Sequence, residues 1–328
     1  MHGFLSPQPL INSWLADEFR HTHFAVTPIT GDASFRRYYR VQLANSSFIV
    51  LSSPPQEPLT PFLNVRQALW DIGLSVPMLF ATNKEQGLLL LSDFGSTQYG
   101  DLVTQPKKAN HLYVCAFYPL IWMQRYLIPM ACSITLPRFS VTFMLEQLTL
   151  FKTWYSERHL QRTLSAQAIQ ELDELLRQIV DVVAEQPLVF SHMDYHSRNL
   201  MVLHKGQMPG ILDFQDAMWA PCTLDLVSLL KDCYLYWPRE QVVQWVREFY
   251  QLKQTESKGA LAVDFHTFLK WFDWTGVQRH LRILGTFSRL HYLHGKSSYL
   301  QYIPRILRDL LEMAQMYPEL RPLQHFLK

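Results

Sequence analysis

The chain has 328 residues, 48% of them hydrophobic and 18% charged, with a formal net charge of +2 at pH 7. This balance excludes a disordered or fibrous protein, and the charges form no concentrated basic patch of the kind that nucleic-acid binders carry. A membrane span, a secretory signal and a metal-type cysteine spacing are likewise not visible, so we expect a cytoplasmic protein with neither a nucleic acid nor a membrane as partner.

Short β-type runs and turn signals alternate through the first hundred residues. Residues 37–43 and 47–51 predict two strands joined at Asn45-Ser46, which is a plausible hairpin turn. Residues 62–69 predict a short helix, and residues 78–82 and 87–91 predict two further strands. The segment therefore indicates a small antiparallel sheet with one helix.

Helical patterns dominate the chain after Gly95. Apolar residues in 165–185 follow the spacing of one buried helix face. Further helices are predicted at residues 223–234, 239–252, 277–294 and 304–316, and short strands at 200–203 and 210–212. The sequence thus predicts an α+β fold with two lobes, a small sheet-based lobe over residues 1–94 and a larger, mainly helical lobe over residues 95–328.

The clearest chemical signal is the run SHMDYHSRN at residues 191–199. Asp194 and Asn199 have the Asp-x4-Asn spacing of a kinase catalytic loop. An aspartate there can orient an attacking hydroxyl, and the asparagine amide oxygen can bind Mg²⁺, which prefers hard oxygen ligands. A second carboxylate, Asp213, follows an apolar strand in GILDFQD. We therefore expect Asp194 to be the catalytic base and Asn199 and Asp213 to be the magnesium ligands.

Simpler interpretations of these residues remain open. Each residue alone is more often a solvated polar group or a turn former. His192 and His196 lie four residues apart, which would suit a metal such as zinc if the segment were a helix. The flanking β-type runs favour a loop instead.

The two runs SHMDYHSRNLMV and ILDFQDA resemble the aminoglycoside phosphotransferase and choline kinase superfamily. This resemblance implies a protein-kinase-like fold, ATP and Mg²⁺ as cofactors, and the roles given above for Asp194, Asn199 and Asp213. It also implies that Asp225 is buried in a helix and supports the catalytic loop. From the sequence alone, Asp225 could equally be a carboxylate that interacts with the helix dipole.

A narrower resemblance runs through nearly the whole chain. The segments ITGDASFRRYYRV, LLLLSDFG and WFDWTGVQRHLRILGTFSRL look like the bacterial N-acetylmuramate/N-acetylglucosamine 1-kinases. The resemblance implies ATP-dependent phosphorylation of the anomeric hydroxyl of a free amino sugar in cell-wall recycling. The preferred sugar and the oligomeric state do not follow from it.

The nucleotide site departs from the general kinase pattern. The strand FIVLS at 48–52 lacks the lysine that grips the phosphates, and the glycine-rich loop is reduced to GDAS. Backbone amides of that turn can still cradle phosphate. Arg36, Arg37 and Arg40 are candidates to replace the lysine charge, although strand alternation prevents all three from facing the nucleotide. The expected nucleotide-binding residues are Gly31, Asp32, Ser34, Arg36, Arg40, Leu91 and Asp93.

The sugar is expected to meet the C-terminal helices. An aromatic face could stack on the sugar ring, and a cation could meet the lactyl carboxylate of N-acetylmuramate. The candidates for these contacts are Trp271, Asp273, Arg279 and His280. Their spacing is equally typical of a helix core.

Other functions fit parts of the sequence. The missing lysine would suit an inactive kinase-like binding module, and the superfamily includes aminoglycoside, choline and homoserine kinases. Residues 256–328 carry six acidic and ten basic residues, an excess that disfavours a polycationic aminoglycoside substrate. Two short motifs, DFG at 93–95 and GKS at 295–297, lack the context that their usual functions require. We expect a hinge segment and a surface turn there.

Overall fold

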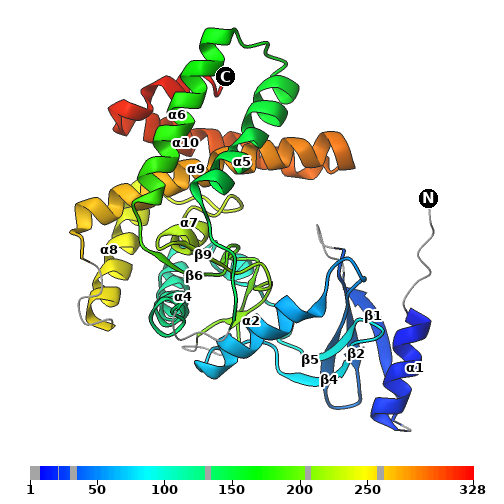
Figure 1. Cartoon of the computed structure of the whole chain (residues 1–328). Coiled ribbons are helices and arrows are strands. Elements are labelled where there is room, and N and C mark those ends of the chain that lie inside the picture. The colour runs from blue at the N-terminus through cyan, green and yellow to red at the C-terminus, as the bar shows by residue number, and fades with distance from the viewer. Residues whose placement is uncertain (1–7, 21, 30–34, 130–133, 204–207, 257–261) are drawn as a thin grey trace. The chain divides into compact units, whose positions relative to one another are not determined.

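The computed structural model describes residues 8–20, 22–29, 35–129, 134–203, 208–256 and 262–328 (Figure 1). Two compact units share the chain. The first comprises Met1–Gln98 and Asn199–Asp216, and the second comprises Tyr99–Arg198 and Ala217–Lys328. A lobe boundary after residue 94 stays a prediction.

A five-stranded antiparallel sheet, in the order β1-β2-β3-β5-β4, forms the first unit. Its strands are β1 (Ala25–Ile29), β2 (Arg37–Gln42), β3 (Ser47–Ser52), β4 (Leu79–Asn83) and β5 (Leu88–Ser92). The four strands predicted from the sequence are confirmed. Strand β1 was not predicted, because Pro28 interrupts its strand pattern; proline is tolerated here since β1 lies at the edge of the sheet.

The two faces of this sheet differ in character because side chains alternate along each strand. On one face, Tyr39, Val41 and Val50 pack against helix α1 (Gln8–Phe19). Tyr38 and Arg40 point to the opposite face. Helix α2 (Leu59–Asp71) follows β3 and contains the predicted segment 62–69.

A small hairpin completes the first unit. Strands β7 (Leu200–Met201) and β8 (Gly210–Ile211) pair antiparallel. A Cβ atom on Gly210 would approach the Phe94 ring to 2.6 Å, so only glycine fits at this position. The ring of Phe214 then lies 4.9 Å from that of Phe62 on α2. The segment that carries Asp213 is therefore held by packing contacts both before it, at Gly210, and after it, at Phe214.

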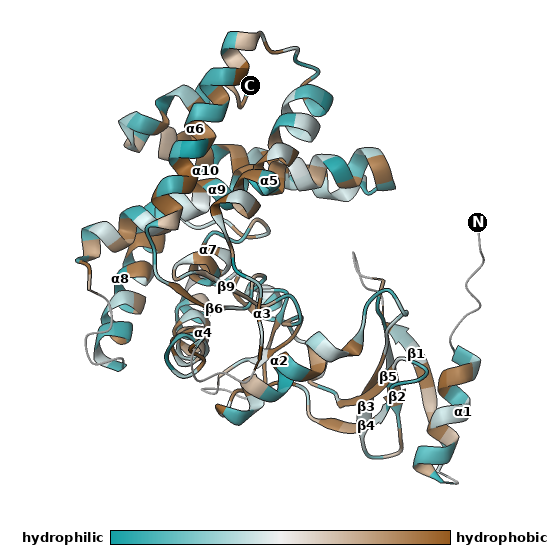
Figure 2. Ribbon diagram, in the orientation of Figure 1, coloured by the Kyte–Doolittle hydropathy of each residue, from teal (hydrophilic) through white to brown (hydrophobic). Residues whose placement is uncertain are grey.

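The second unit is mainly helical, which confirms the predicted α+β class. Besides the two-stranded pair β6 (Leu188–Ser191) and β9 (Met218–Pro221), its main elements are α3 (Tyr99–Leu102), α4 (Pro106–Tyr126), α5 (Val141–Leu150), the π-helix η1 (Phe151–His159), α6 (Ala166–Ala184), α7 (Leu224–Leu230), α8 (Arg239–Glu256), α9 (Phe265–His294), α10 (Ile303–Met316), and the short 3₁₀ helices η2 (Ser297–Tyr302) and η3 (Pro318–His325). Figure 2 shows hydrophilic and hydrophobic residues alternating along α6, the pattern that predicted this helix.

Helix α9 begins twelve residues before the predicted start at 277. Asp264 caps it by accepting a hydrogen bond from the Thr267 backbone N–H at 2.8 Å. Every residue from 271 to 281 is buried, so this stretch has no polar face and shows no amphipathic period. The helix ends at Gly295, which adopts a left-handed conformation (φ 65°). The predicted surface turn at 295–297 is thus the C-terminal cap of α9.

Gly285 allows α9 to pack closely against the junction of α5 and the π-helix. A Cβ atom at this position would lie 2.3 Å from the carbonyl carbon of Leu150 and 2.6 Å from the backbone nitrogen of Phe151. Both are backbone atoms, which cannot move aside as a side chain can.

We therefore expect Gly285→Ala to destabilise the protein by about 1–3 kcal/mol, the usual cost of overpacking. Gly276→Ala is the matched control on the same helix, since its Cβ would meet only the flexible Lys231 side chain, at 3.0 Å. Both substitutions gain the same helix propensity. Thermal unfolding of the two variants measures the difference, and equal melting temperatures would contradict the packing argument.

Candidate active site

The turn before Asp194 is held by a buried carboxylate. Strand β6 ends at Ser191, and the chain then turns through Met193, which has a φ of 78°. A positive φ is strained for a side chain of this kind. Asp225 on α7 is 1% exposed and accepts the backbone N–H groups of His192 at 2.6 Å and Met193 at 3.0 Å. The expected support of the loop by Asp225 is confirmed.

Burial raises the pKa of Asp225, and the nearby His192 together with the two amides lowers it only in part. Two backbone amides directed at one buried carboxylate also stabilise the left-handed turn that presents them. The loop conformation and the position of Asp225 therefore depend on each other.

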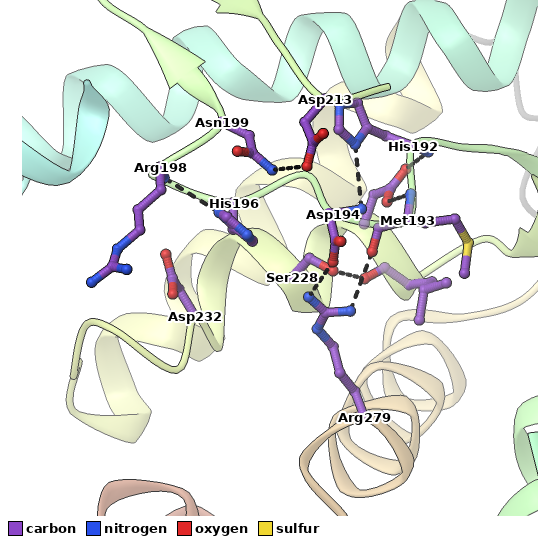
Figure 3. A network of polar contacts seen from close by, with 12 residues as sticks. His192, Met193, Asp194, His196, Arg198, Asn199, Asp213, Ser228, Asp232 and Arg279 are labelled. Atoms are coloured by element: carbon purple, nitrogen blue, oxygen red, sulfur yellow. Dashed lines mark hydrogen bonds and ion pairs between the residues drawn. The ribbon is translucent and has the colours of Figure 1, made fainter. Parts of the chain in front are cut away.

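Arg279 on α9 binds the turn from the other side (Figure 3). Its Nη2 atom lies 3.2 Å from Oδ1 of Asp194, and its Nη1 donates to the Met193 carbonyl at 3.2 Å. The Arg279 side chain is 8% exposed, whereas that of Asp194 is 47% exposed. One guanidinium thus fixes the strained peptide and orients a carboxylate that still faces solvent.

The charges around Asp194 keep it ionised. Burial raises its pKa, but neighbouring cations lower it by more, so the pKa lies below its ordinary value. Arg279 contributes most, and His196, Arg282 and His192 contribute less. An ionised carboxylate of this kind can accept a hydrogen bond from a hydroxyl group.

The two histidines of the loop stabilise its backbone. Nδ1 of His192 lies 3.3 Å from the backbone nitrogen of Asp194, and Nδ1 of His196 lies 3.3 Å from that of Arg198. Residues 192–199 are a loop, as predicted. Within the described parts of the chain, no group of three or more His, Cys, Asp or Glu residues could hold a metal ion.

Asn199 and Asp213 meet within the first unit (Figure 3). The Asn199 side-chain nitrogen lies 3.4 Å from Oδ2 of Asp213, and the Leu212 backbone N–H donates to the Asn199 carbonyl at 3.0 Å. Asp213 has a φ of 63°, and Gln215 donates to its other oxygen at 2.8 Å. A carboxylate and an amide side by side form the oxygen donor set that suits Mg²⁺, which keeps several water ligands. These residues fit the ion.

Two predicted nucleotide-binding residues form an ion pair with each other. Arg40 Nε lies 2.7 Å from Oδ2 of Asp93, and the same guanidinium donates to the Gly95 carbonyl at 2.9 Å. Burial raises the pKa of Asp93, whereas Arg40 and the Gly95 amide lower it to a net value below its ordinary one. Arg40 therefore ties β2 to the segment after β5.

Arg36 is a second buried arginine of the first unit. Its Nε lies 3.3 Å from both the Ser53 hydroxyl and a carboxylate oxygen of Glu57. Burial and the Asp213 carboxylate raise the pKa of Tyr38 to about 12, and Arg36 acts in the opposite direction. Both Arg36 and Asp213 therefore act electrostatically on the Tyr38 hydroxyl.

Of the remaining expected residues, Leu91 is a buried residue of β5, and Gly31, Asp32 and Ser34 lie outside the described residues. Their nucleotide contacts stay predictions.

Among the expected sugar-binding residues, the structure brings only Arg279 to Asp194. Trp271 donates to Glu185 at 3.2 Å, and His280 lies 3.1 Å from the Lys231 carbonyl. Asp273 is fully buried, with its carboxylate bound by other side chains. These are Arg239, at 2.6 and 2.5 Å, Tyr317, at 2.8 Å, and Lys231, at 3.3 Å. Packing in the second unit accounts for these three residues, and their contact with sugar stays a prediction.

Sequence reasoning missed the groups that hold the second half of the loop. The Ser197 hydroxyl donates to Asp232 at 2.5 Å, and the Arg198 guanidinium lies 3.5 Å from the ring centroid of Tyr234. Arg198 also donates to the Tyr302 hydroxyl at 2.9 Å. No spacing pattern links these residues, which lie up to about a hundred positions apart.

Comparison with known proteins identifies the fold and the chemistry together. The model of the phosphotransferase enzyme family matches residues 25–262, more than half of the chain. The chain belongs to this family. It is therefore an ATP-dependent phosphotransferase, and its expected kinase-like fold is confirmed.

The curated relatives are similar over most of their length. An N-acetylmuramate/N-acetylglucosamine kinase of Pseudomonas aeruginosa is 37% identical over 92% of this chain and 87% of its own. The protein with the same name in Pseudomonas putida is 35% identical over 91% of this chain and 86% of its own. The predicted resemblance to these kinases is confirmed.

Solved structures share the fold at low sequence identity. The choline kinase LicA of Streptococcus pneumoniae has a TM-score of 0.65 at 12% identity, covering 94% of this chain and 100% of its own. The GDP complex of an aminoglycoside 2′-phosphotransferase has a TM-score of 0.64 at 13% identity, covering 95% of this chain and 100% of its own.

No helix in the described residues is long and apolar enough to cross a membrane.

The Arg279–Asp194 pair predicts a pH effect. Because Arg279 lowers the pKa of Asp194, Arg279→Met should raise that pKa. The acid limb of the kcat/KM profile should then move to higher pH, since the carboxylate must be ionised to accept the hydroxyl proton. Arg279→Lys keeps the charge and should shift the limb less. An acid limb that stays in place in Arg279→Met would contradict this role.

Proposed function

We propose that this phosphotransferase transfers the γ-phosphoryl group of ATP to the anomeric hydroxyl of N-acetylmuramate and N-acetylglucosamine. The observation that carries the proposal is the ionised, half-exposed Asp194 on its braced turn. The relatives named for these two sugars, aligned over nearly the whole chain, supply the substrate class. We further propose that the enzyme works in the cytoplasm, where ATP is available, in the recycling of cell-wall sugars.

The reaction follows from the chemistry of the hydroxyl. An anomeric hydroxyl is more acidic than an ordinary alcohol, so a carboxylate with a lowered pKa is basic enough to orient it. Asp194 would accept its hydrogen bond while the sugar oxygen forms a bond to the γ-phosphorus. The bond from that phosphorus to the β-phosphate oxygen breaks, ADP leaves with the electron pair, and the hydroxyl proton passes to Asp194. Positioning and charge neutralisation then supply most of the rate enhancement.

We propose that Asn199 and Asp213 hold the magnesium ion. A bound Mg²⁺ would neutralise charge on the donor phosphates. The support for these ligands is their donor chemistry, their contact at 3.4 Å and the left-handed conformation of Asp213. The hairpin β7–β8 and its anchored glycine keep the two side chains together.

Arg36 is our candidate for the missing lysine of β3. In kinases that lysine pairs with a glutamate on the following helix and contacts the phosphates. Arg36 pairs with Glu57, which lies two residues before α2, and both Arg36 and Asp213 influence the pKa of Tyr38. A guanidinium offers five N–H donors in a fork that suits both carboxylate and phosphate. Arg40 is engaged by Asp93 and the Gly95 carbonyl instead.

The sugar kinase is tested by product analysis. Phosphorus NMR after incubation with MgATP and each sugar should show phosphate on the anomeric oxygen. Asp194→Asn should lower kcat by a factor on the order of 10² or more, the scale of a lost general base, with the melting temperature as the control for folding. Phosphate on the 6-hydroxyl, or turnover of neither sugar, would reject the proposal.

The arginine assignment is tested at the sheet. Arg36→Ala should lower kcat/KM for ATP by about 10- to 100-fold, the scale of a lost charge-assisted phosphate contact. Arg36→Lys should retain part of the wild-type kcat/KM for ATP. Arg37→Ala is the matched control, because Arg37 is exposed and alternates to the other face. Equal losses in the Arg36→Ala and Arg37→Ala variants would show that Arg36 has no special role.

A further inference from the structure

Arg282 is the next cation after Arg279 on the side of α9 that meets the Asp194 loop. It lies three residues after Arg279 on α9, about 4.5 Å further along the helix axis and on the same side of the helix. Its side chain is half-buried in a stretch where most neighbours are fully buried. In the part of the chain that the structure describes, no hydrogen bond or ion pair engages its guanidinium.

Arg282 keeps its charge at neutral pH. Burial and the adjacent Arg279 lower the pKa of Arg282 to about 10, while Asp194 acts in the opposite direction. A partly desolvated guanidinium close to a second arginine is unfavourable without an anion. Asp194 forms its ion pair at 3.2 Å with Arg279.

The other charged side chains of this region are already engaged. Arg198 stacks on Tyr234 and donates to Tyr302. Of the nearby carboxylates, Asp225 binds two loop amides and Asp232 binds Ser197. The surroundings of Asp194 therefore favour an anionic acceptor and disfavour a polycationic one.

We infer that Arg282 binds the lactyl carboxylate of N-acetylmuramate when Asp194 binds its anomeric hydroxyl. This inference rests on the proposed sugar kinase function and assigns to Arg282 the role that the sequence suggested for Arg279. The lactyl group is attached at C3 of the sugar ring, two ring carbons from the reacting C1. A cation one helical turn beyond the Asp194–Arg279 pair suits that separation. N-acetylglucosamine has only a hydroxyl group at C3 and gains nothing from the charge.

The test compares kcat/KM for the two sugars. Arg282→Gln should lower the value for N-acetylmuramate by about 10- to 100-fold more than that for N-acetylglucosamine, the scale of a lost charge-assisted hydrogen bond. Both values are measured above the acid limb, because loss of Arg282 also raises the pKa of Asp194 for either sugar. Arg282→Lys should keep part of the preference for N-acetylmuramate over N-acetylglucosamine. Arg289→Gln is the matched control, since Arg289 is a half-buried arginine two turns further along α9. It should leave the ratio between the sugars unchanged.

A modified substrate completes a double-mutant cycle. The amide of N-acetylmuramate, which lacks the negative charge, should be a poorer substrate than the acid for the wild type. For Arg282→Gln, acid and amide should be equal, because either change alone removes the ion pair. Equal losses on both sugars, or an acid preference that survives in Arg282→Gln, would overturn the inference while the sugar kinase stands. A wild-type protein that phosphorylates neither sugar would instead remove the proposed function itself.

Discussion

The geometry around Asp194 depends on the two hydrogen bonds that Asp225 accepts from the turn before it. Met193 adopts a conformation that an isolated chain would avoid, and a buried carboxylate with two amide donors offsets that cost. Arg279 contacts the same turn through the Met193 carbonyl and continues to Asp194. Asp225 and Arg279 together thus hold a strained peptide in place, and the Asp194 carboxylate is oriented as a consequence.

Helix α9 organises the second unit around this turn. Its residues 271–281 are buried on every side, so the polar side chains of this stretch need partners inside the protein. Asp273 is bound by Arg239, Lys231 and Tyr317, and Thr275 accepts from Gln186 at 2.8 Å. Such fully paired contacts fix the rotation and register of the helix, because a buried charge without a partner would cost several kcal/mol. A helix held in this way can place Arg279 accurately.

The first unit carries two arginine–carboxylate pairs close to strand β2. Arg40 pairs with Asp93 and Arg36 with Glu57, and Tyr38 lies between the two arginines on β2. Alternation along the strand directs these side chains to the face opposite α1. The face that α1 covers is apolar. The opposite face combines these charged pairs with the buried side chains of Leu51, Leu89 and Leu91.

The sequence alone determined the local elements and the reactive motif. Each of these features depends on residues that are close together in the sequence. They are the alternation of the strands, the amphipathic period of helices such as α6, and the Asp194–Asn199 spacing. The sequence could not reveal the start of α9, because a helix that is buried all round has no amphipathic period.

Only the tertiary structure decided the partners of the reactive residues. Arg279 meets Asp194 across 85 positions, and Asp232 meets Ser197 across 35. The same packing directs Asp273 and His280 into the interior and leaves Arg282 beside Asp194, although all three share one helix with Arg279. Which face of that helix meets the loop is set by buried ion pairs and close glycine contacts between segments far apart in the chain. No local pattern encodes such contacts, because their energy exists only once both segments are folded.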